Sequence, residues 1–308
     1  MILCAGESLI DMVPENGNFR PLAGGAVYNT TVALGRLGEP TAYLWPISRD
    51  PFGEVLLRPL LEAGVNVDLC PRTDRLTTLA LVTLIGGDAH YAFYDEGSAG
   101  RMLAPEDIPA LPADIEAIFV GGISLVPDPC GAAIEALVAA NHHDLPVMID
   151  PNIRPFFIQD AAAFRDRLSR LLPLADIVKL SSDDLEWLHP GLSSEDAARE
   201  VLRGGTGIVL QTGGASGARA FWAGETVSAP AVRTNVADTI GAGDTFNAGV
   251  LASLRRQGVL TKQGLASIGP GQIRGALSLG AQAAAITVSR AGANPPWAHE
   301  MPAEVTYP

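Results

Sequence analysis

From residue 118 onward the chain alternates between short apolar runs and helical segments, and this alternation limits its fold more than any other feature. The order of expected elements is strand 118–124, helix 129–141, strand 146–150, helix 160–172, strand 177–180, helices 183–189 and 194–203, and strand 208–210. Apolar strands separated by helices of this length form a mostly parallel sheet with helices on both faces. We therefore expect an α/β fold whose ligands bind at the carboxyl ends of the strands.

Polar side chains follow three of these strands, at the positions where such sheets bind ligands. The segments are Asp150-Pro151-Asn152-Ile153-Arg154, Lys179-Leu180-Ser181-Ser182-Asp183-Asp184 and Thr212-Gly213-Gly214. All three segments are candidates for the functional site, because ligands of open α/β sheets bind outside the carboxyl ends of the strands.

Two stretches in the first hundred residues have a different pattern. Residues 8–13 predict a strand with Asp11 at or just past its end, and the turn residues at 14–18 indicate a hairpin. Residues 79–85 and 90–94 predict a second hairpin through Gly86-Gly87-Asp88. We expect these stretches to form a small sheet that projects from the main domain. Asp11 is either a ligand contact or a solvated aspartate at a strand end.

Other local signals complete the expected secondary structure. Gly24-Gly25 precede a helix over residues 26–37, and Asn29 lies one turn into it, where a buried amide needs a specific partner. The remaining expected elements are a strand at 41–48, a turn at 49–53, a helix at 54–63, a strand at 65–70, a β segment at 218–231 and a helix at 271–288.

Residues 238–249 combine a turn of small residues with the start of an apolar helix. Gly241-Ala242-Gly243 lies at the helix N-terminus, where unpaired N–H groups and the helix dipole make a site for an anion, commonly phosphate. Asp244 enters the same turn, and a carboxylate suits a phosphate site if it acts on a neighbouring substrate hydroxyl. Alternatively, the glycines serve only a tight turn and Asp244 only caps the helix.

Composition excludes several classes of function. The net charge is −13 and the pI is near 4.7, which argues against nucleic acid as a partner. No apolar run approaches the ~18 residues of a membrane span, and the N-terminus has no basic signal region, so we expect a cytoplasmic protein. Three dispersed cysteines indicate buried reduced thiols, and the histidines have no zinc-site spacing.

The chain resembles the ribokinase-like (PfkB) carbohydrate kinases over essentially its full length. Two patterns carry the resemblance, Gly24-Gly25-Ala26-Val27-Tyr28-Asn29 with residues 32–38, and Asp238-Thr239-Ile240-Gly241-Ala242-Gly243-Asp244-Thr245-Phe246. The resemblance implies one Rossmann-like α/β domain over residues 1–308. It also implies a β-sheet lid, formed by about residues 8–22 and 70–100, that closes over the sugar and often pairs two subunits.

The resemblance further implies ATP-dependent phosphorylation of a sugar hydroxyl, with Mg²⁺ and often a stimulating K⁺. Asp244 would be the base, and the turn Gly241, Ala242 and Gly243 would hold the phosphate charge. By matching positions, the implied sugar and phosphate ligands are Asp11, Gly24, Gly25, Asn29 and Arg154, and the implied nucleotide contacts are Asn152, Lys179, Thr212, Gly214 and Gly217. Asp184 would bind Mg²⁺ through water, with Asp183 as a rival, and Asp238 would belong to a monovalent-cation loop with carbonyls near residues 289–292.

The segments Gly6-Glu7-Ser8-Leu9-Ile10-Asp11 and Phe93-Tyr94-Asp95-Glu96-Gly97-Ser98-Ala99 are similar to bacterial fructokinases, which favours fructose as the sugar. Asp95-Glu96 stands where fructokinases often have a basic residue, so 2-keto-3-deoxygluconate or another sugar or nucleoside remains an alternative. From a different class, a non-catalytic sugar-binding regulator would need a lost base, and Asp244 is present. An NAD-dependent oxidoreductase would need GxGxxG after the first strand, which Gly6-Glu7-Ser8 does not supply.

Overall fold

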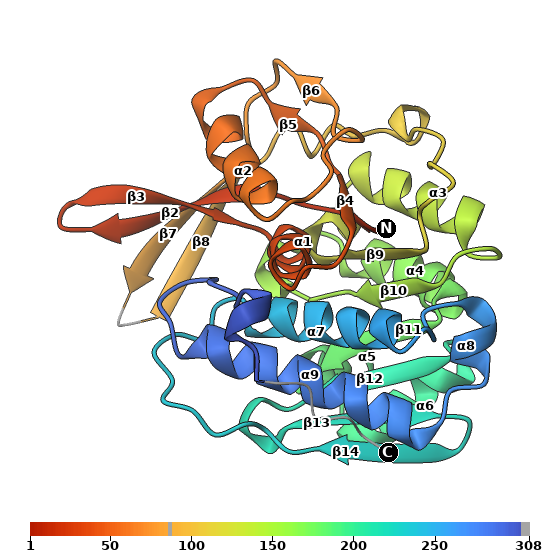
Figure 1. Cartoon of the computed structure of the whole chain (residues 1–308). Helices are drawn as coiled ribbons and strands as arrows, with labels where there is room; N and C mark the ends of the chain where they lie inside the picture. Colours follow the sequence, from red (N-terminus) through yellow and green to blue (C-terminus); the bar gives the residue numbers. More distant parts are fainter. Residues whose placement is uncertain (86–87, 303–308) are drawn as a thin grey trace.

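The computed structural model describes residues 1–85 and 88–302 (Figure 1). Its body is an eight-stranded sheet in the order β14-β13-β12-β11-β10-β9-β1-β4. The strands are β1 (Ile2–Ala5), β4 (Thr41–Leu44), β9 (Ala117–Gly121), β10 (Val147–Asp150), β11 (Ile177–Ser181), β12 (Ile208–Thr212), β13 (Ala218–Trp222) and β14 (Glu225–Ala229). Every neighbouring pair from β12 to β4 is parallel, and β13 and β14 form an antiparallel hairpin at one edge. The predicted mostly parallel α/β fold is confirmed.

Helices cover the body sheet on both faces. They are α1 (Ala26–Arg36), α2 (Pro51–Glu62), α3 (Cys130–Asn141), α4 (Ala161–Leu171), α5 (Ser182–Leu188), α6 (Ser194–Arg203), α7 (Ala242–Arg256), α8 (Lys262–Ala266) and α9 (Pro270–Val288). Helix α7 packs against both α1 and α9, whereas α3 packs on α4 and α5 on α6. This packing brings the N-terminal part of the chain, in α1, against the C-terminal part, in α7.

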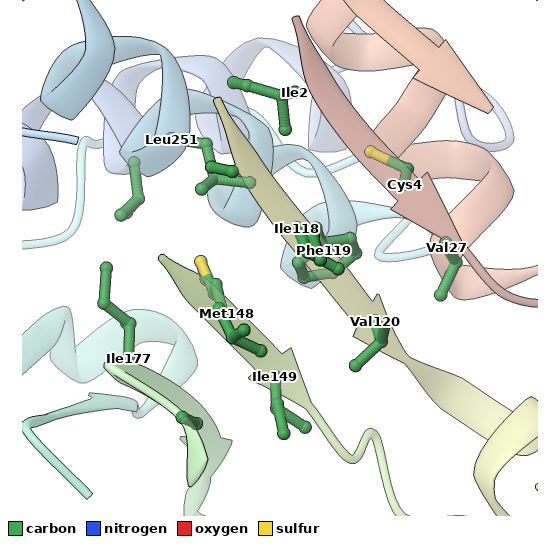
Figure 2. Packing of buried hydrophobic residues seen from close by; sticks show 14 of the residues in the cluster. Ile2, Cys4, Val27, Ile118, Phe119, Val120, Met148, Ile149, Ile177 and Leu251 are labelled. Atoms are coloured by element: carbon green, nitrogen blue, oxygen red, sulfur yellow. The ribbon is translucent and has the colours of Figure 1, made fainter. Parts of the chain in front are cut away.

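The hydrophobic core lies between the sheet and these helices. Side chains of β1, β9, β10 and β11 pack together with Leu251 of α7 (Figure 2). The inner strands are buried on both faces, as their nearly continuous apolar sequences predict. The three cysteines are buried and free, as expected.

A second, four-stranded sheet projects from one side of the body (Figure 1). Its order is β3-β2-β7-β8, with β2 (Leu9–Glu15), β3 (Asn18–Gly24), β7 (Leu79–Ile85) and β8 (Asp88–Tyr94). Two antiparallel hairpins make this sheet, as predicted, and β2 joins them by pairing parallel to β7. Of the predicted turn, Gly86 and Gly87 lie outside the described residues, and Asp88 begins β8.

Some predicted boundaries were wrong for identifiable reasons. The strand predicted at residues 65–70 is a turn with one bridge from Asn66 to Ala42, because the Asn66 side chain accepts a hydrogen bond from the Asp68 N–H. The strand predicted at 41–48 is divided into β4 and β5 (Ile47–Ser48), and Pro46, which has no N–H to pair, lies between them. Strand β5 pairs instead with β6 (Arg72–Thr73).

Two further helical segments depart from the sequence pattern. Helix α2 starts at Pro51 inside the predicted turn, because the Asp50 side chain caps it by accepting from the Gly53 N–H at 2.7 Å. The strand predicted to run to residue 124 ends at Gly121 and continues as the 3₁₀ turn η2 (Gly122–Leu125). The short helix α8 was not predicted.

Candidate active site

The centre of the candidate site is the first turn of α7. The helix begins at Ala242, and its N-cap, Gly241, has a left-handed backbone with φ 78° and no side chain to cap the helix. The Ala242 N–H makes a long bond of 3.3 Å to the Thr239 carbonyl. The N–H groups of Gly243 and Asp244 belong to the first turn, whose donors have no acceptor within the helix. The predicted anion turn therefore has the backbone geometry that its sequence implied.

Asp244 is held in this turn by helix α1. The Asn29 side-chain amide donates to Asp244 Oδ2 at 2.9 Å, and the Thr30 hydroxyl donates to the Asp244 carbonyl at 3.1 Å. Only 8% of Asp244 is exposed. Burial raises the pKa of Asp244 to about 6, and the negative charge of Asp150 adds to this, while the bond from Asn29 and the charge of Lys179 act in the opposite direction. Asn29 thus has the specific partner that its position required.

Asp150, Lys179 and Asn247 form a buried polar cluster next to the first turn of α7. Asp150, at the end of β10, accepts from Lys179 Nζ at 3.1 Å and from Asn247 Nδ2 at 2.7 Å. A Cβ added to Gly243 would stand 3.1 Å from Lys179 Nζ, so this cation lies directly beside the start of α7. Burial opposes the charge of Lys179, but the carboxylates of Asp150, Asp184 and Asp244 outweigh it and raise its pKa. A positive charge is therefore favoured beside the first turn of α7.

The loops after β10 and β11 are tied together by Asp184. Its Oδ1 accepts from the Ile153 N–H at 2.8 Å, and its Oδ2 accepts from the N–H and the hydroxyl of Ser181, both at 2.7 Å. Both oxygens therefore already accept protein hydrogen bonds, while the rival Asp183 is exposed. Asn152 has a left-handed backbone with φ 46° and donates its N–H to Asp150. Arg154 is exposed two residues later in the same loop.

Asp11 and Gly24 lie together where the second sheet meets the body. A Cβ on Gly24 would stand only 2.4 Å from Asp11 Oδ2, so the carboxylate lies against the Gly24 backbone. Burial raises the pKa of Asp11 to about 6. Burial also raises the pKa of Tyr91 in β8, with the charge of Asp11 adding to the rise and that of Arg154 opposing it. The charges of Asp11 and Arg154 therefore both act on Tyr91, where the second sheet meets the body.

The remaining predicted residues lie along the other side of the turn. Thr212 ends β12 in register with Ser181, and the turn from Gly214 to Gly217 closes through a bond from the Gly213 N–H to the Gly217 carbonyl. Asp238 accepts from the Ile240 N–H at 3.0 Å and from the Gly292 N–H at 2.9 Å. That second bond joins the loop before α7 to the loop after α9.

Sequence reasoning missed three residues of the site. Asn247 lies three positions after Asp244 on α7, so helical spacing could have placed it on the same face. Tyr91 and Phe93 are two positions apart on β8 and so share one face of the strand, which gave a weaker signal. Glu7 was quoted only for its similarity to other sequences. Its buried carboxylate accepts N–H groups from two segments, and burial raises its pKa to about 7.

Comparison with known proteins adds independent findings. Residues 1–300 match the sequence profile of the pfkB family carbohydrate kinases. The chain is 45% identical to a fructokinase of Rhizobium leguminosarum bv. trifolii, covering 87% of this chain and 84% of the relative. It is 32% identical to a fructokinase of Escherichia coli, covering 84% and 85% respectively. The structure is similar to a crystal structure of fructokinase with bound ATP from Xylella fastidiosa, with a TM-score of 0.88, 30% identity and coverage of 95% and 93%. Within residues 1–85 and 88–302, no helix is both long and apolar enough to cross a membrane.

Proposed function

Since this chain belongs to the pfkB family of carbohydrate kinases, we propose that it transfers the γ-phosphate of ATP to a hydroxyl group of fructose. The observation that carries the proposal is the hydrogen bond from Asn29 to the buried carboxylate of Asp244 in the first turn of α7. It fixes a carboxylate beside a helix N-terminus, so that a hydroxyl and a phosphate can meet there. The fructokinase relatives support fructose as the sugar.

Asp244 acts as the base in this proposal. Phosphoryl transfer has a loose transition state, so the base mainly orients the hydroxyl and accepts its proton late. A pKa of about 6 keeps most of the Asp244 carboxylate ionised at neutral pH and still basic enough to take a proton. Asn29 occupies Oδ2, which leaves Oδ1 for the sugar hydroxyl.

The phosphate charge is stabilised by groups that are fixed before the reaction. They are the N–H groups at the start of α7 and the Lys179 ammonium beside Gly243. Arg154 steadies a phosphate from the exposed loop, because its guanidinium can fork onto anionic oxygens. Asn152, Thr212, Gly214 and Gly217 contact the nucleotide along the neighbouring strand ends.

Two cations belong to the proposal. Mg²⁺ neutralises the phosphates of ATP when bound, and it usually keeps several waters and few protein ligands. The donor set fits this behaviour, because Asp184 Oδ1 accepts only one protein hydrogen bond and its second lone pair could accept from a water that the ion binds. K⁺ would be held by the loop that Asp238 joins to Gly292.

The second sheet acts as a lid that holds the sugar through Asp11 and Gly24, together with Gly25 at the start of α1. The Asp11 carboxylate accepts hydrogen bonds from sugar hydroxyl groups and would repel an acidic sugar, which favours fructose over 2-keto-3-deoxygluconate. Asp95 contributes less to that repulsion, because it forms an ion pair with Arg101 at 2.8 Å. Pairing of two subunits through this lid stays a prediction from the family resemblance.

The test is a substrate panel with the purified protein, ATP and Mg²⁺, in K⁺ and in Na⁺. ADP release is measured with fructose, glucose, ribose, 2-keto-3-deoxygluconate and adenosine, and the product is identified by mass. We expect fructose to give the highest kcat/KM. A higher value for another sugar would replace fructose, and binding of sugar without any turnover would favour a regulator.

A further inference from the structure

Glu7 follows β1 at the edge of the site and has no part in the chemistry above. Its side chain is buried, with 5% of the residue exposed. Oε1 accepts the Ala26 N–H at 2.8 Å, and Oε2 accepts the Ser124 N–H at 3.2 Å. One carboxylate therefore links the start of α1 to η2, the turn that follows β9.

Helix α1 has no N-cap side chain of its own, and the bond from Ala26 to Glu7 takes the place of that cap. Its N-cap residue is Gly25, which has no side chain, and the first N–H groups of a helix need outside acceptors. Glu7 provides two acceptors, its Oε1 for Ala26 and its backbone carbonyl for Tyr28 at 3.3 Å. A carboxylate at this end also interacts favourably with the helix dipole.

We call the two bonds from Ala26 and Ser124 to the Glu7 carboxylate the clamp, and glycines at 122 and 25 leave the space that Glu7 occupies. A Cβ on Gly122 would stand 2.1 Å from Oε1, and a Cβ on Gly25 would stand 2.4 Å from the Glu7 carbonyl. Gly122 and Gly25 both have positive φ, of 66° and 113°, so backbone conformation and space together require glycine there. The segments that contain Gly25 and Gly122 both pack directly against Glu7.

The clamped turn of α1 leads directly to Asn29. The Asn29 N–H donates to the Gly25 carbonyl at 2.8 Å, and its side chain donates to Asp244 at 2.9 Å. We propose that Glu7 is a positioning residue that fixes Asn29 and, through it, the carboxylate of the base Asp244. This inference rests on the proposed kinase function. Displacement of a reacting group by about 1 Å can cost roughly 100-fold in rate, so the clamp matters for turnover.

The test is a double-mutant cycle between Glu7→Gln and Asn29→Ala. The side-chain amide of the E7Q variant keeps one acceptor and turns its NH₂ toward the other donor, so the clamp is half lost. We expect kcat for the sugar to fall about 10- to 100-fold in E7Q, with the KM for ATP nearly unchanged. In the N29A background the same change should lower kcat less than threefold, because the link to Asp244 is already absent. An equal fall in both backgrounds, or a normal kcat in E7Q, would overturn the proposal.

Glu39→Gln is the matched control. Glu39 is also buried and follows the other end of α1, where it forms ion pairs with Arg255 and Arg256. E39Q should lower thermal stability and leave kcat unchanged. If E7Q does not fold, Glu7→Asp keeps the charge, shortens the reach and takes its place in the cycle.

Hydrogen exchange separates this inference from the proposed function. Amides of Ala26 to Asn29 should exchange faster in E7Q than in wild type and E39Q, whether or not a sugar is phosphorylated. An inactive wild type with faster exchange in E7Q would remove the kinase proposal and keep the clamp. Unchanged exchange in E7Q would remove the clamp.

Discussion

At the scale of the residue, burial affects the two charged groups of the site differently. It disfavours the ionised form of Asp244, whereas Lys179 stays charged in spite of it. Asp244 has to be ionised to act as a base, and burial works against that ionisation, which raises its pKa to about 6. Lys179 is just as enclosed, but carboxylates around it keep it charged. Ionised Asp244 is thus held at a cost in stability, whereas the charge of Lys179 is balanced by its ion pair with Asp150.

Substitution of Asp244 by asparagine should reveal that cost. An unfolded aspartate ionises near 3.8 and the folded one near 6, so the native state loses stability as pH rises from about 4 through 6. The difference of about two units corresponds to about 3 kcal/mol above pH 6. We expect D244N to lower kcat 100-fold or more, to keep ATP binding, and to melt at a higher temperature than wild type at pH 7.5.

Calorimetry across pH checks this prediction. The gain in Tm of D244N over wild type should shrink as pH falls from 7 to 4, because wild-type Asp244 becomes protonated. A variant that is less stable at pH 7.5, or that turns over near the wild-type rate, would contradict it.

At the scale of the element, helix α7 carries Asp244 in its first turn and contributes buried residues to the core along its length. Left-handed glycines stand at its two ends, Gly241 with φ 78° before it and Gly258 with φ 70° after it. A Cβ on Gly241 would stand 2.8 Å from Ala293 Cβ, whereas a Cβ on Gly258 would meet nothing within 4 Å. Both ends of α7 therefore need a residue with positive φ, but only Gly241 is closely packed by other residues.

Alanine substitutions at Gly241 and Gly258 distinguish an effect on ATP binding at the start of α7 from an effect on the stability of the helix. Gly258→Ala should cost about 1 kcal/mol through its left-handed backbone and leave kinetics unchanged. Gly241→Ala should cost more and also raise the KM for ATP tenfold or more, because the contact with Ala293 moves the N–H groups of the turn. Thermal melts and ATP titrations measure both effects, and equal ATP kinetics in the two variants would be the contrary result.

At the scale of the whole molecule, a cluster of four aromatic rings joins the second sheet to the body. Tyr91 of β8 stacks on Phe156 at 5.4 Å between ring centroids, and Phe93 meets Phe157 edge-on at 4.7 Å. Phe156 and Phe157 follow Arg154 in the loop after β10. The rings therefore connect the strand that carries Tyr91 to the loop that carries Arg154.

Phe156→Ala should loosen this connection without unfolding the body. Phe156 is 59% exposed, so its loss removes little core packing. We expect the KM for the sugar to rise about fivefold, with a change in Tm of only a few degrees. Tyr94→Ala is the control, since Tyr94 is 62% exposed and points to the opposite face of β8. Equal sugar KM values in the two variants would show that the cluster does not steady the lid.

Much of this architecture follows from the sequence alone. Strand–helix alternation after residue 118 predicted the parallel sheet, and the two hairpins predicted the second sheet. Residues 241–244 indicated an anion turn with a carboxylate, because glycine conformation and helix starts depend on neighbours along the chain. Where local signals competed, prediction failed, as at Asn66, whose side chain makes a turn inside an apolar stretch.

How those local features meet depends on tertiary packing. Asn29 and Asp244 are 215 positions apart, Asp150 and Asn247 are 97 apart, and Glu7 and Ser124 are 117 apart. No pattern along the chain encodes such pairs, since they arise from the packing of α1 on α7 and from the order of the parallel strands. The order of residues specifies which groups can do the chemistry, and the packing of distant segments specifies which of them touch.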